Sequence, residues 1–273
     1  MASARPDRLT RHRARNFPPV ALAGGAALGV LFIALPLVGL ILRAPWQSTL
    51  VVLGSPEALD AIRLSLVCSL SATGVALVLG VPLAWVQARV NYRGKSLVRA
   101  LTTLPMVLPP VVGGVALLFA FGRHGLLGGV LFDAFGIQLP FSAAGVILAE
   151  TFVSMPFLVL TVEAGFRAVN ERLEEAARTL GAGQWRVFRQ VTLPLAAPSI
   201  FAGAVLCWSR ALGEFGATIT FAGNLPGQTQ TLPLAVYVLL ETSPEAAVLL
   251  SIVMVVVSVV VLVGLRDRYL RWG

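Results

Sequence analysis

Arg210, Glu214 and Thr218 follow one another at intervals of four residues inside an apolar stretch. On one continuous helix this spacing places the three side chains on the same face. A guanidinium there can attract an oxyanion, or it can pair with the neighbouring carboxylate. With Glu150 from another apolar stretch at similar depth, the cluster holds one arginine and two glutamates, and its net charge of −1 makes a poor site for a dianion. Charges in apolar surroundings usually pair with one another, so we favour an ion pair or gate.

A second group of candidate residues lies in a polar, charged island, "EEAARTLGAGQWRVFRQVTLPLAAP" (174–198). Asn170 is a good N-cap, and the glutamates that follow it suit the positive end of a helix. Gly181 can end that helix in the left-handed conformation, and a second short helix carrying Trp185 follows. We therefore expect a helix–glycine–helix elbow over about residues 166–195. The elbow can lie on lipid headgroups, but its glutamates disfavour an anionic surface and favour docking into a partner's groove.

These residues belong to a chain of 273 residues that is 57% hydrophobic and 12% charged, with a mean hydropathy of +0.84. Soluble domains carry about 25% charged residues, so the composition predicts a membrane protein. The net charge is +8, but most of the 21 basic residues fall in four clusters that alternate with other loops. The clusters lie at 5–15, 89–99, 167–189 and 266–271. This alternation follows the positive-inside rule and disfavours nucleic acid as a partner.

Apolar stretches long enough to cross a bilayer recur along the chain, separated by short loops. They cover residues 20–42, 62–86, 100–121, 143–162, 197–221 and 246–265. An even number of spans, with the basic clusters inside, puts both ends of the chain in the cytoplasm. We predict an all-α polytopic membrane protein with six transmembrane helices. Its parts are a basic cytoplasmic tail (1–19), a transmembrane domain (20–265) and a cytoplasmic C-terminal tail (266–273).

Three local features refine this division. The first apolar run is longer than the core of a signal peptide and shows no small-residue cleavage site after it, so we interpret it as a retained helix. The third run contains Pro105, Pro109 and Pro110, which predict a kinked or broken helix. A further apolar stretch, 232–241, is too short to span the membrane and is expected to form an outer helix.

The sequence does not indicate catalytic chemistry in this chain. Cys68 and Cys207 fall in apolar runs, where small buried side chains are expected, and the two histidines have no neighbours suited to a metal. The glycine-rich "GRHGLLGG" lacks the lysine of a phosphate-binding loop, and the pattern Gly-x-x-x-x-Gly-Lys-Ser/Thr does not occur. We expect no catalytic residue, no metal and no cofactor in this chain.

The polar island also matches a known pattern. Glu175-Ala176-Ala177, then Gly181 after three residues and 191–194 ("VTLP") after nine more, resemble the EAA loop of permease subunits of binding-protein-dependent ABC importers. The family has isoleucine where this chain has Val191. The resemblance implies a type I importer fold, in which Glu175 of the coupling helix faces a basic residue in a cleft of the ATPase. It assigns ATPase docking to Glu174, Glu175, Ala176, Ala177, Leu180, Gly181, Trp185, Leu193 and Pro194.

Two further stretches are similar to those of molybdate permeases: "RALGEFGATITFAGNLPGQTQTLPLAVY" (210–237) and "LPMVLPPVVGGVALLFAFGRHGLLG" (104–128). Sulfate permeases share the Gly-Glu-Phe-Gly core and differ more in "ATITFAGN". This resemblance, over roughly residues 55–265, implies inward transport of molybdate or tungstate across the cytoplasmic membrane. The implied partners are a second copy of the chain, two cytoplasmic ABC ATPase subunits, an external molybdate-binding protein and the lipid bilayer.

A transport path that binds its cargo weakly releases it readily, and tight capture belongs to the external protein. The path is therefore expected to use uncharged hydroxyls, namely Thr151, Ser154, Thr218 and Thr220. Three alternatives stay open: a sulfate ABC permease with the same mechanism, a secondary transporter in which Glu150 and Glu214 couple an ion, and a membrane enzyme. The secondary transporter requires internal repeats, and the enzyme requires clustered histidines and carboxylates; neither feature is clear in the sequence.

Overall fold

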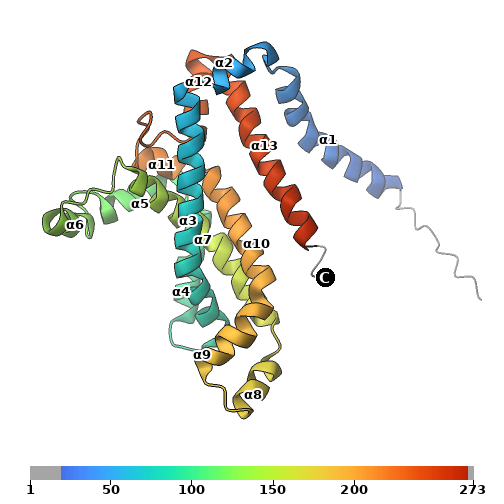
Figure 1. Ribbon diagram of the computed structural model, residues 1–273, viewed down its shortest axis with the longest axis vertical. Helices are drawn as coiled ribbons and strands as arrows, with labels where there is room; N and C mark the ends of the chain where they lie inside the picture. Colours follow the sequence, from blue (N-terminus) through green and yellow to red (C-terminus); the bar gives the residue numbers. More distant parts are fainter. Residues whose placement is uncertain (1–19, 270–273) are drawn as a thin grey trace, which may run out of the picture. The chain divides into compact units, whose positions relative to one another are not determined.

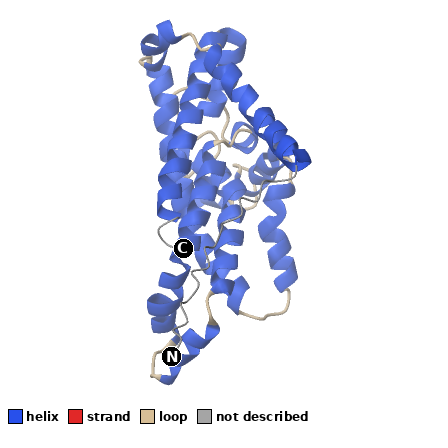
Figure 2. Ribbon diagram, turned by 90° about the vertical axis from the view of Figure 1, so that its right-hand side faces the viewer, coloured by secondary structure: helices blue, strands red, loops and turns tan. Residues whose placement is uncertain are grey.

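The computed structural model describes residues 20–269, which form helices and loops with no strand in that range (Figure 1 and Figure 2). The prediction of an all-α fold is confirmed. The chain divides into two compact units between Ala44 and Pro45. In the first unit the described part is the helix α1 (Val20–Leu42) and the short turn after it. The predicted tail 1–19 and the last residues, 270–273, lie outside the described residues.

The second unit is built around three long helices that lie against one another. Its elements, in chain order, are η1 (Trp46–Ser48), α2 (Thr49–Leu53), α3 (Pro56–Arg89), α4 (Lys95–Val107), α5 (Pro110–Phe121), α6 (Gly128–Phe135), α7 (Ala143–Ala168), α8 (Glu171–Thr179), α9 (Gln184–Val187), η2 (Phe188–Thr192), α10 (Leu193–Leu212), α11 (Gly216–Phe221), α12 (Leu232–Thr242) and α13 (Pro244–Tyr269). Helix α7 packs against α3 and α10, and α10 also packs against α3. Their shared core includes Leu158, Phe166 and Cys207.

The long helices begin where the sequence provides caps. The Ser55 hydroxyl accepts a hydrogen bond from the backbone N–H of Ala58 at 3.3 Å, and Pro56 occupies the first helical position of α3. Ser142 caps α7 in the same way, through the N–H of Gly145 at 3.1 Å. These local signals fix where the helices that carry the functional residues start.

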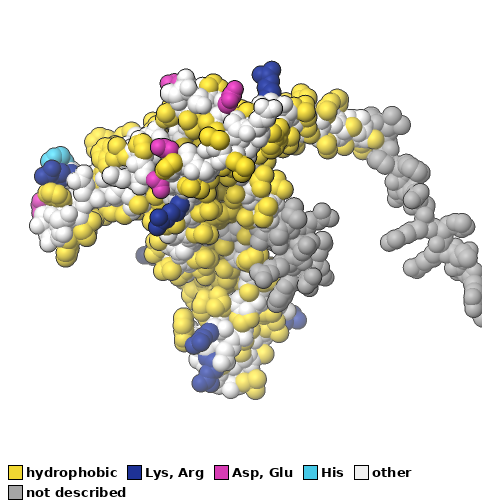
Figure 3. All heavy atoms as spheres, turned by 45° about the horizontal axis from the view of Figure 1, so that its top comes forward, with side chains coloured by type: hydrophobic (Ala, Val, Ile, Leu, Met, Phe, Trp, Pro, Cys, Tyr) yellow, Lys and Arg dark blue, Asp and Glu magenta, His cyan; other side chains and the backbone are white. Residues whose placement is uncertain are grey.

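Five helices within the described residues are long and apolar enough to cross a membrane. They are Leu22–Leu42, Pro56–Arg89, Ala143–Ala168, Gln184–Leu212 and Pro244–Val261, and two shorter apolar helices are Pro110–Phe121 and Leu232–Thr242. Apolar side chains cover most of the face seen in Figure 3; basic side chains lie both at its lower end and higher up, and the acidic side chains lie in its upper part. This distribution fits a chain that contacts lipid over its middle.

The expected third and fifth spans are each divided in two. Helix α4 ends before Pro109, and α5 starts at Pro110, because a proline lacks an N–H and restricts the residue before it. The fifth span ends at Leu212 and resumes as α11, which the sequence did not predict. The loop expected at 122–142 contains a short helix, α6, which ends at Gly136 with φ 67°. The count of six spans stays a prediction.

A close contact between α5 and α11 yields a test of this packing. A Cβ atom at Gly114 would lie 2.6 Å from Thr220 Cβ and 2.9 Å from the Ala217 carbonyl oxygen. We expect Gly114→Ala to lower the free energy of unfolding by about 1–3 kcal/mol through overpacking. Thermal unfolding of the purified protein measures this. The matched control is Gly74→Ala in α3, where a Cβ meets nothing within 4 Å; equal melting temperatures for the two variants would contradict the prediction.

Candidate functional site

The polar island folds as an elbow of two helices, α8 and α9. Asn170 caps α8, its Oδ1 accepting from the N–H of Arg172 at 3.1 Å. Two backbone hydrogen bonds end the helix: the N–H of Ala182 donates to the carbonyl of Ala177 at 3.1 Å, and the N–H of Gly181 donates to the carbonyl of Arg178 at 2.9 Å. Gly181 has φ 86°, a left-handed conformation that favours glycine. The predicted N-cap and glycine bend are confirmed.

The outer side of the elbow presents a carboxylate next to apolar side chains. Glu175 and Ala176 are exposed and Ala177 is half-buried. Leu180 is 89% exposed and Trp185 is 72% exposed. We call these five residues the coupling surface. Large apolar side chains left in contact with water next to a charge are typical of a docking site for another protein.

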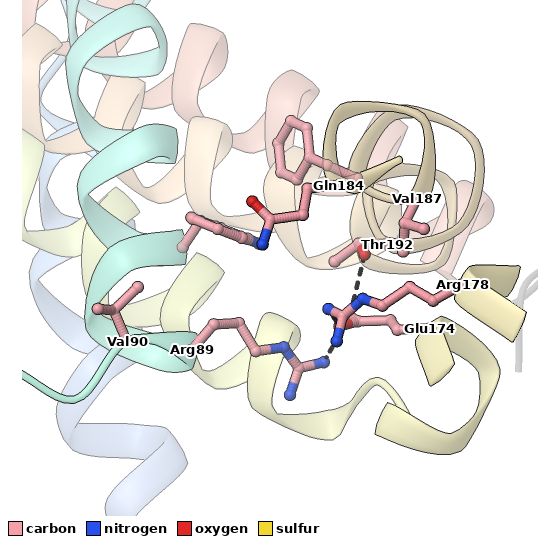
Figure 4. A pocket seen from close by; sticks show the side chains of 9 residues that line it. Arg89, Val90, Glu174, Arg178, Gln184, Val187 and Thr192 are labelled. Atoms are coloured by element: carbon pink, nitrogen blue, oxygen red, sulfur yellow. Dashed lines mark hydrogen bonds and ion pairs between the residues drawn. The ribbon is translucent and has the colours of Figure 1, made fainter. Parts of the chain in front are cut away.

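The elbow is also tied to the long helices by its inner side. Glu174, grouped with the docking residues from the sequence, is buried and turned inward (Figure 4). Its Oε1 accepts hydrogen bonds from Arg89 Nη2 and Thr192 Oγ1, each at 2.9 Å. Of the other residues assigned to docking, Leu193 is half-buried and Pro194 is exposed, at the start of α10. Adjacent glutamates therefore have opposite surroundings.

An aromatic cluster fastens the second half of the elbow. Phe188 begins η2, a π-helical turn between α9 and α10. Its ring lies 5.7 Å from Trp85 of α3, 6.3 Å from Phe166 of α7 and 5.6 Å from Trp185, centroid to centroid. Such aromatic contacts stabilise packing beyond the area that they bury. The elbow is thus held against α3 and α7 by apolar contacts as well as by Glu174.

A small cavity of about 190 Å³ separates the elbow from the end of α3 (Figure 4). Arg89, Glu174, Arg178 and Gln184 supply its polar lining. No group of three or more His, Cys, Asp or Glu side chains suited to a metal occurs among the described residues. Cys68 and Cys207 are free and buried, as expected for small core side chains. The cavity belongs to the junction between elbow and spans.

Farther along the chain, Arg210 and Glu214 form the ion pair that their spacing suggested. Arg210 Nη2 lies 2.7 Å from Glu214 Oε2, and Glu214 Oε1 accepts from the N–H of Ala217 at 2.8 Å. The reason assigned to the pairing was wrong, since α10 ends at Leu212 and no continuous helix carries Arg210, Glu214 and Thr218. Glu214 lies just before α11, whose residue Ala217 donates its N–H to the Glu214 carboxylate.

Comparison with known proteins identifies the class of this molecule. Residues 76–271 match the family described as "Binding-protein-dependent transport system inner membrane component". The chain belongs to this family. This permease is therefore a multi-pass protein of the cytoplasmic membrane and a transport component rather than an enzyme.

Individual relatives are similar over most of the permease. It is 46% identical over 243 residues to the molybdenum transport system permease protein ModB of Mycobacterium tuberculosis, covering 89% of this chain and 92% of that protein. It is 33% identical over 268 residues to the probable sulfate transport system permease protein cysT of Chlorokybus atmophyticus, covering 94% and 90%. A crystal structure of a bacterial ABC transporter involved in the import of the acidic polysaccharide alginate matches with a TM-score of 0.72 at 20% identity, covering 92% and 94%. The importer-permease fold is thus confirmed.

The structure buries or half-buries the other predicted residues of the permease. Among the described residues, the buried Glu150 of α7 forms no ion pair and its Oε2 has no hydrogen-bond partner, so it does not pair with Arg210. Thr151 and Ser154 donate to carbonyls of their own helix, at 2.7 and 2.6 Å. Thr220 does the same at 2.8 Å, whereas the buried Thr218 hydroxyl has no partner. Their role in a path stays a prediction.

The permease also uses residues that sequence reasoning did not select. Arg89 entered the sequence argument only as one of the basic residues that set orientation. Trp85 entered it only as part of the second apolar run, and Phe166 only as the first residue of the expected elbow. In the structure Arg89 binds the elbow and the two aromatic residues contact Phe188. The one local signal for Arg89 is its place at the end of a long apolar run. Nothing in the sequence joins it to a glutamate 85 residues away.

Proposed function

We propose that this permease forms the membrane path of an ABC importer that carries molybdate or tungstate inward. The observation that carries the proposal is the 46% identity to a molybdenum transport permease over 89% of the chain, against 33% to a sulfate permease. Molybdate and tungstate are tetrahedral dianions of similar size, so one path serves both. Sulfate transport by the same mechanism is the second candidate.

The importer contains two copies of this chain, two cytoplasmic ABC ATPase subunits and an external molybdate-binding protein. ATP sites of such pumps close between two ATPases, and each ATPase needs an elbow, so the permease is a homodimer. The alginate transporter, which shares the fold, has been crystallised with a periplasmic protein bound to an alginate pentasaccharide, which supports a binding protein as partner. The chain has no phosphate-binding loop of its own, so ATP and its chemistry belong to the ATPase.

The coupling surface receives the movement of the ATPase. Glu175 pairs with a basic residue of the ATPase cleft, while Leu180 and Trp185 enter its apolar floor; their exposure in the free chain supports this role. Ala176 and Ala177 allow close approach, Gly181 provides the bend, and Leu193 and Pro194 lead into α10. When ATP draws the ATPases together, the two elbows approach each other and the spans pivot to open outward.

The membrane part guides the ion without holding it tightly. Six spans, with the broken α4–α5 segment as the third, leave both ends and the elbow in the cytoplasm. Arg210 and Glu214 neutralise each other across the gap between α10 and α11, so their pair stabilises the bundle or acts as a gate. Glu150 and the hydroxyls of Thr151, Ser154, Thr218 and Thr220 lie near the path.

Uptake of labelled molybdate by the reconstituted complex tests the proposed function. We expect ATP-dependent uptake that vanadate inhibits and that excess tungstate competes with far better than excess sulfate. Equal competition by sulfate would favour the second candidate. Uptake that is insensitive to vanadate but is abolished by a protonophore alone would support a secondary transporter and contradict the proposal.

A further inference from the structure

Arg89 joins the end of α3 to the elbow through three contacts. Its Nη1 donates to Glu171 Oε1 at 2.8 Å, and its Nη2 donates to Glu174 Oε1 at 2.9 Å and to the Val169 carbonyl at 3.0 Å. The side chain is only 9% exposed. Val169 lies in the link between α7 and α8. One guanidinium therefore connects the last residue of α3 to this link and to the first turn of α8.

Glu174 extends this connection to α10. Its side chain is 7% exposed, and the oxygen that accepts from Arg89 also accepts from Thr192 Oγ1 at 2.9 Å. Thr192 is the last residue of η2, immediately before α10. The other oxygen lies 3.7 Å from Arg178 Nη2. A single carboxylate thus bridges α3, α8 and the start of α10 (Figure 4).

The Glu174 carboxylate has different surroundings from Glu175, its neighbour in the coupling surface. Glu175 faces solvent, and among the described residues its side chain has no hydrogen bond or ion pair. Glu174 accepts its hydrogen bonds from within the chain and is turned away from the coupling surface. An almost buried pair of charges is costly to desolvate and is often no more stabilising than apolar packing. Its arrangement therefore calls for a role other than stability.

We propose that Arg89, Glu174 and Thr192 form a latch that carries movement of the elbow into α3 and α10. This inference rests on the proposed function. The three are positioning residues, because they touch neither nucleotide nor cargo. The aromatic contacts of Phe188 with Trp85 keep the elbow attached when the latch is broken. A permease without the latch binds its ATPase and allows ATP hydrolysis, but the long helices no longer follow the elbow.

The test measures ATP hydrolysis and molybdate uptake by the same reconstituted complex. Glu174→Gln keeps the shape and the acceptor for Thr192 but removes the charge that holds Arg89; Arg89→Gln removes the other partner. For both variants we expect normal assembly with the ATPase and a rate of ATP hydrolysis within about twofold of wild type. The amount of molybdate moved per ATP should fall about tenfold, which is the size of an ordinary coupling between sites. The charge-exchanged double variant, Arg89→Glu with Glu174→Arg, is expected to recover part of this ratio.

The matched control is Glu171→Gln, the same change on the same helix. Glu171 is 71% exposed, and its loss leaves the contact between Arg89 and Glu174 intact, so the ratio should stay within about twofold of wild type. An unchanged ratio in Glu174→Gln, a parallel fall of hydrolysis and uptake, or loss of assembly with the ATPase would each overturn the latch. Wild-type protein that moves no molybdate with ATP would instead contradict the proposed function.

Discussion

Replacing Glu175 with arginine is expected to abolish ATP-driven uptake while the permease still inserts and folds. Glu175 is exposed in the middle of α8, and among the described residues its side chain has no hydrogen bond or ion pair, so the change removes nothing from the fold. In the proposed complex it places two cations against each other at the centre of the docking contact. Like charges juxtaposed in an interface cost several kcal/mol, and each 1.4 kcal/mol is a factor of about ten in affinity, so we expect uptake to be lost. Co-purification with the ATPase and uptake assays measure the two effects.

The control for this variant is the same charge reversal away from the elbow. Glu241 is exposed in the last turn of α12, where an arginine is compatible with the helix end. We expect Glu241→Arg to assemble with the ATPase and to transport normally. Normal transport by Glu175→Arg would refute the docking role of the coupling surface. If both variants are lost from the membrane, the lost uptake reflects defective insertion and contradicts the docking explanation.

Replacing Arg210 with methionine is expected to destabilise the permease strongly. Glu214 is almost completely buried, and its counter-charge at 2.7 Å comes from Arg210, whose side chain is 29% exposed. Removing one partner of a buried pair leaves an uncompensated charge, at a cost of about 3 kcal/mol. For a protein of this size we expect the melting temperature to fall by roughly 5–10 °C. Thermal unfolding in detergent measures the change.

A second substitution distinguishes an ion pair from an anion attractor at this position. Glu214→Gln keeps the acceptor for the N–H of Ala217 and removes the buried charge. Combined with Arg210→Met, it should restore most of the lost stability and near-normal half-saturation for molybdate uptake. If Arg210 instead attracts the oxyanion, Arg210→Met will keep the wild-type melting temperature and raise the half-saturation concentration for molybdate. Adding Glu214→Gln will then restore neither stability nor half-saturation.

The elements of the elbow were predictable from the sequence because their signals act within a turn of backbone. Asn170 caps α8 through a bond to a residue two positions on, and Gly181 closes it with contacts to the preceding turn. The two prolines at 109 and 110 break the third apolar run for an equally local reason. These features were correct without knowledge of any distant residue.

The intramembrane residues show where such reasoning stops. Spacing by four predicted the contact of Arg210 with Glu214, and the contact exists, but the chain leaves the helix at Leu212 between them. At the break the Glu214 carboxylate accepts a hydrogen bond from the N–H of Ala217 in the next helix. Similar depth in the apolar stretches suggested that Glu150 joins the cluster, whereas the structure leaves it without an ion pair among the described residues. A periodic pattern assumes one continuous helix and says nothing of which helices become neighbours.

The sequence by itself determined the class of the molecule: apolar runs long enough to span, basic clusters in alternate loops, and a capped, glycine-bent elbow. Hydropathy and backbone preference are properties of short segments, so they can be read without the fold. Only the tertiary structure decided that Glu175 faces outward while Glu174 turns inward to Arg89, 85 residues away. That choice depends on how α3 and α10 pack beside the elbow, and no local pattern encodes which of two adjacent glutamates meets a distant arginine.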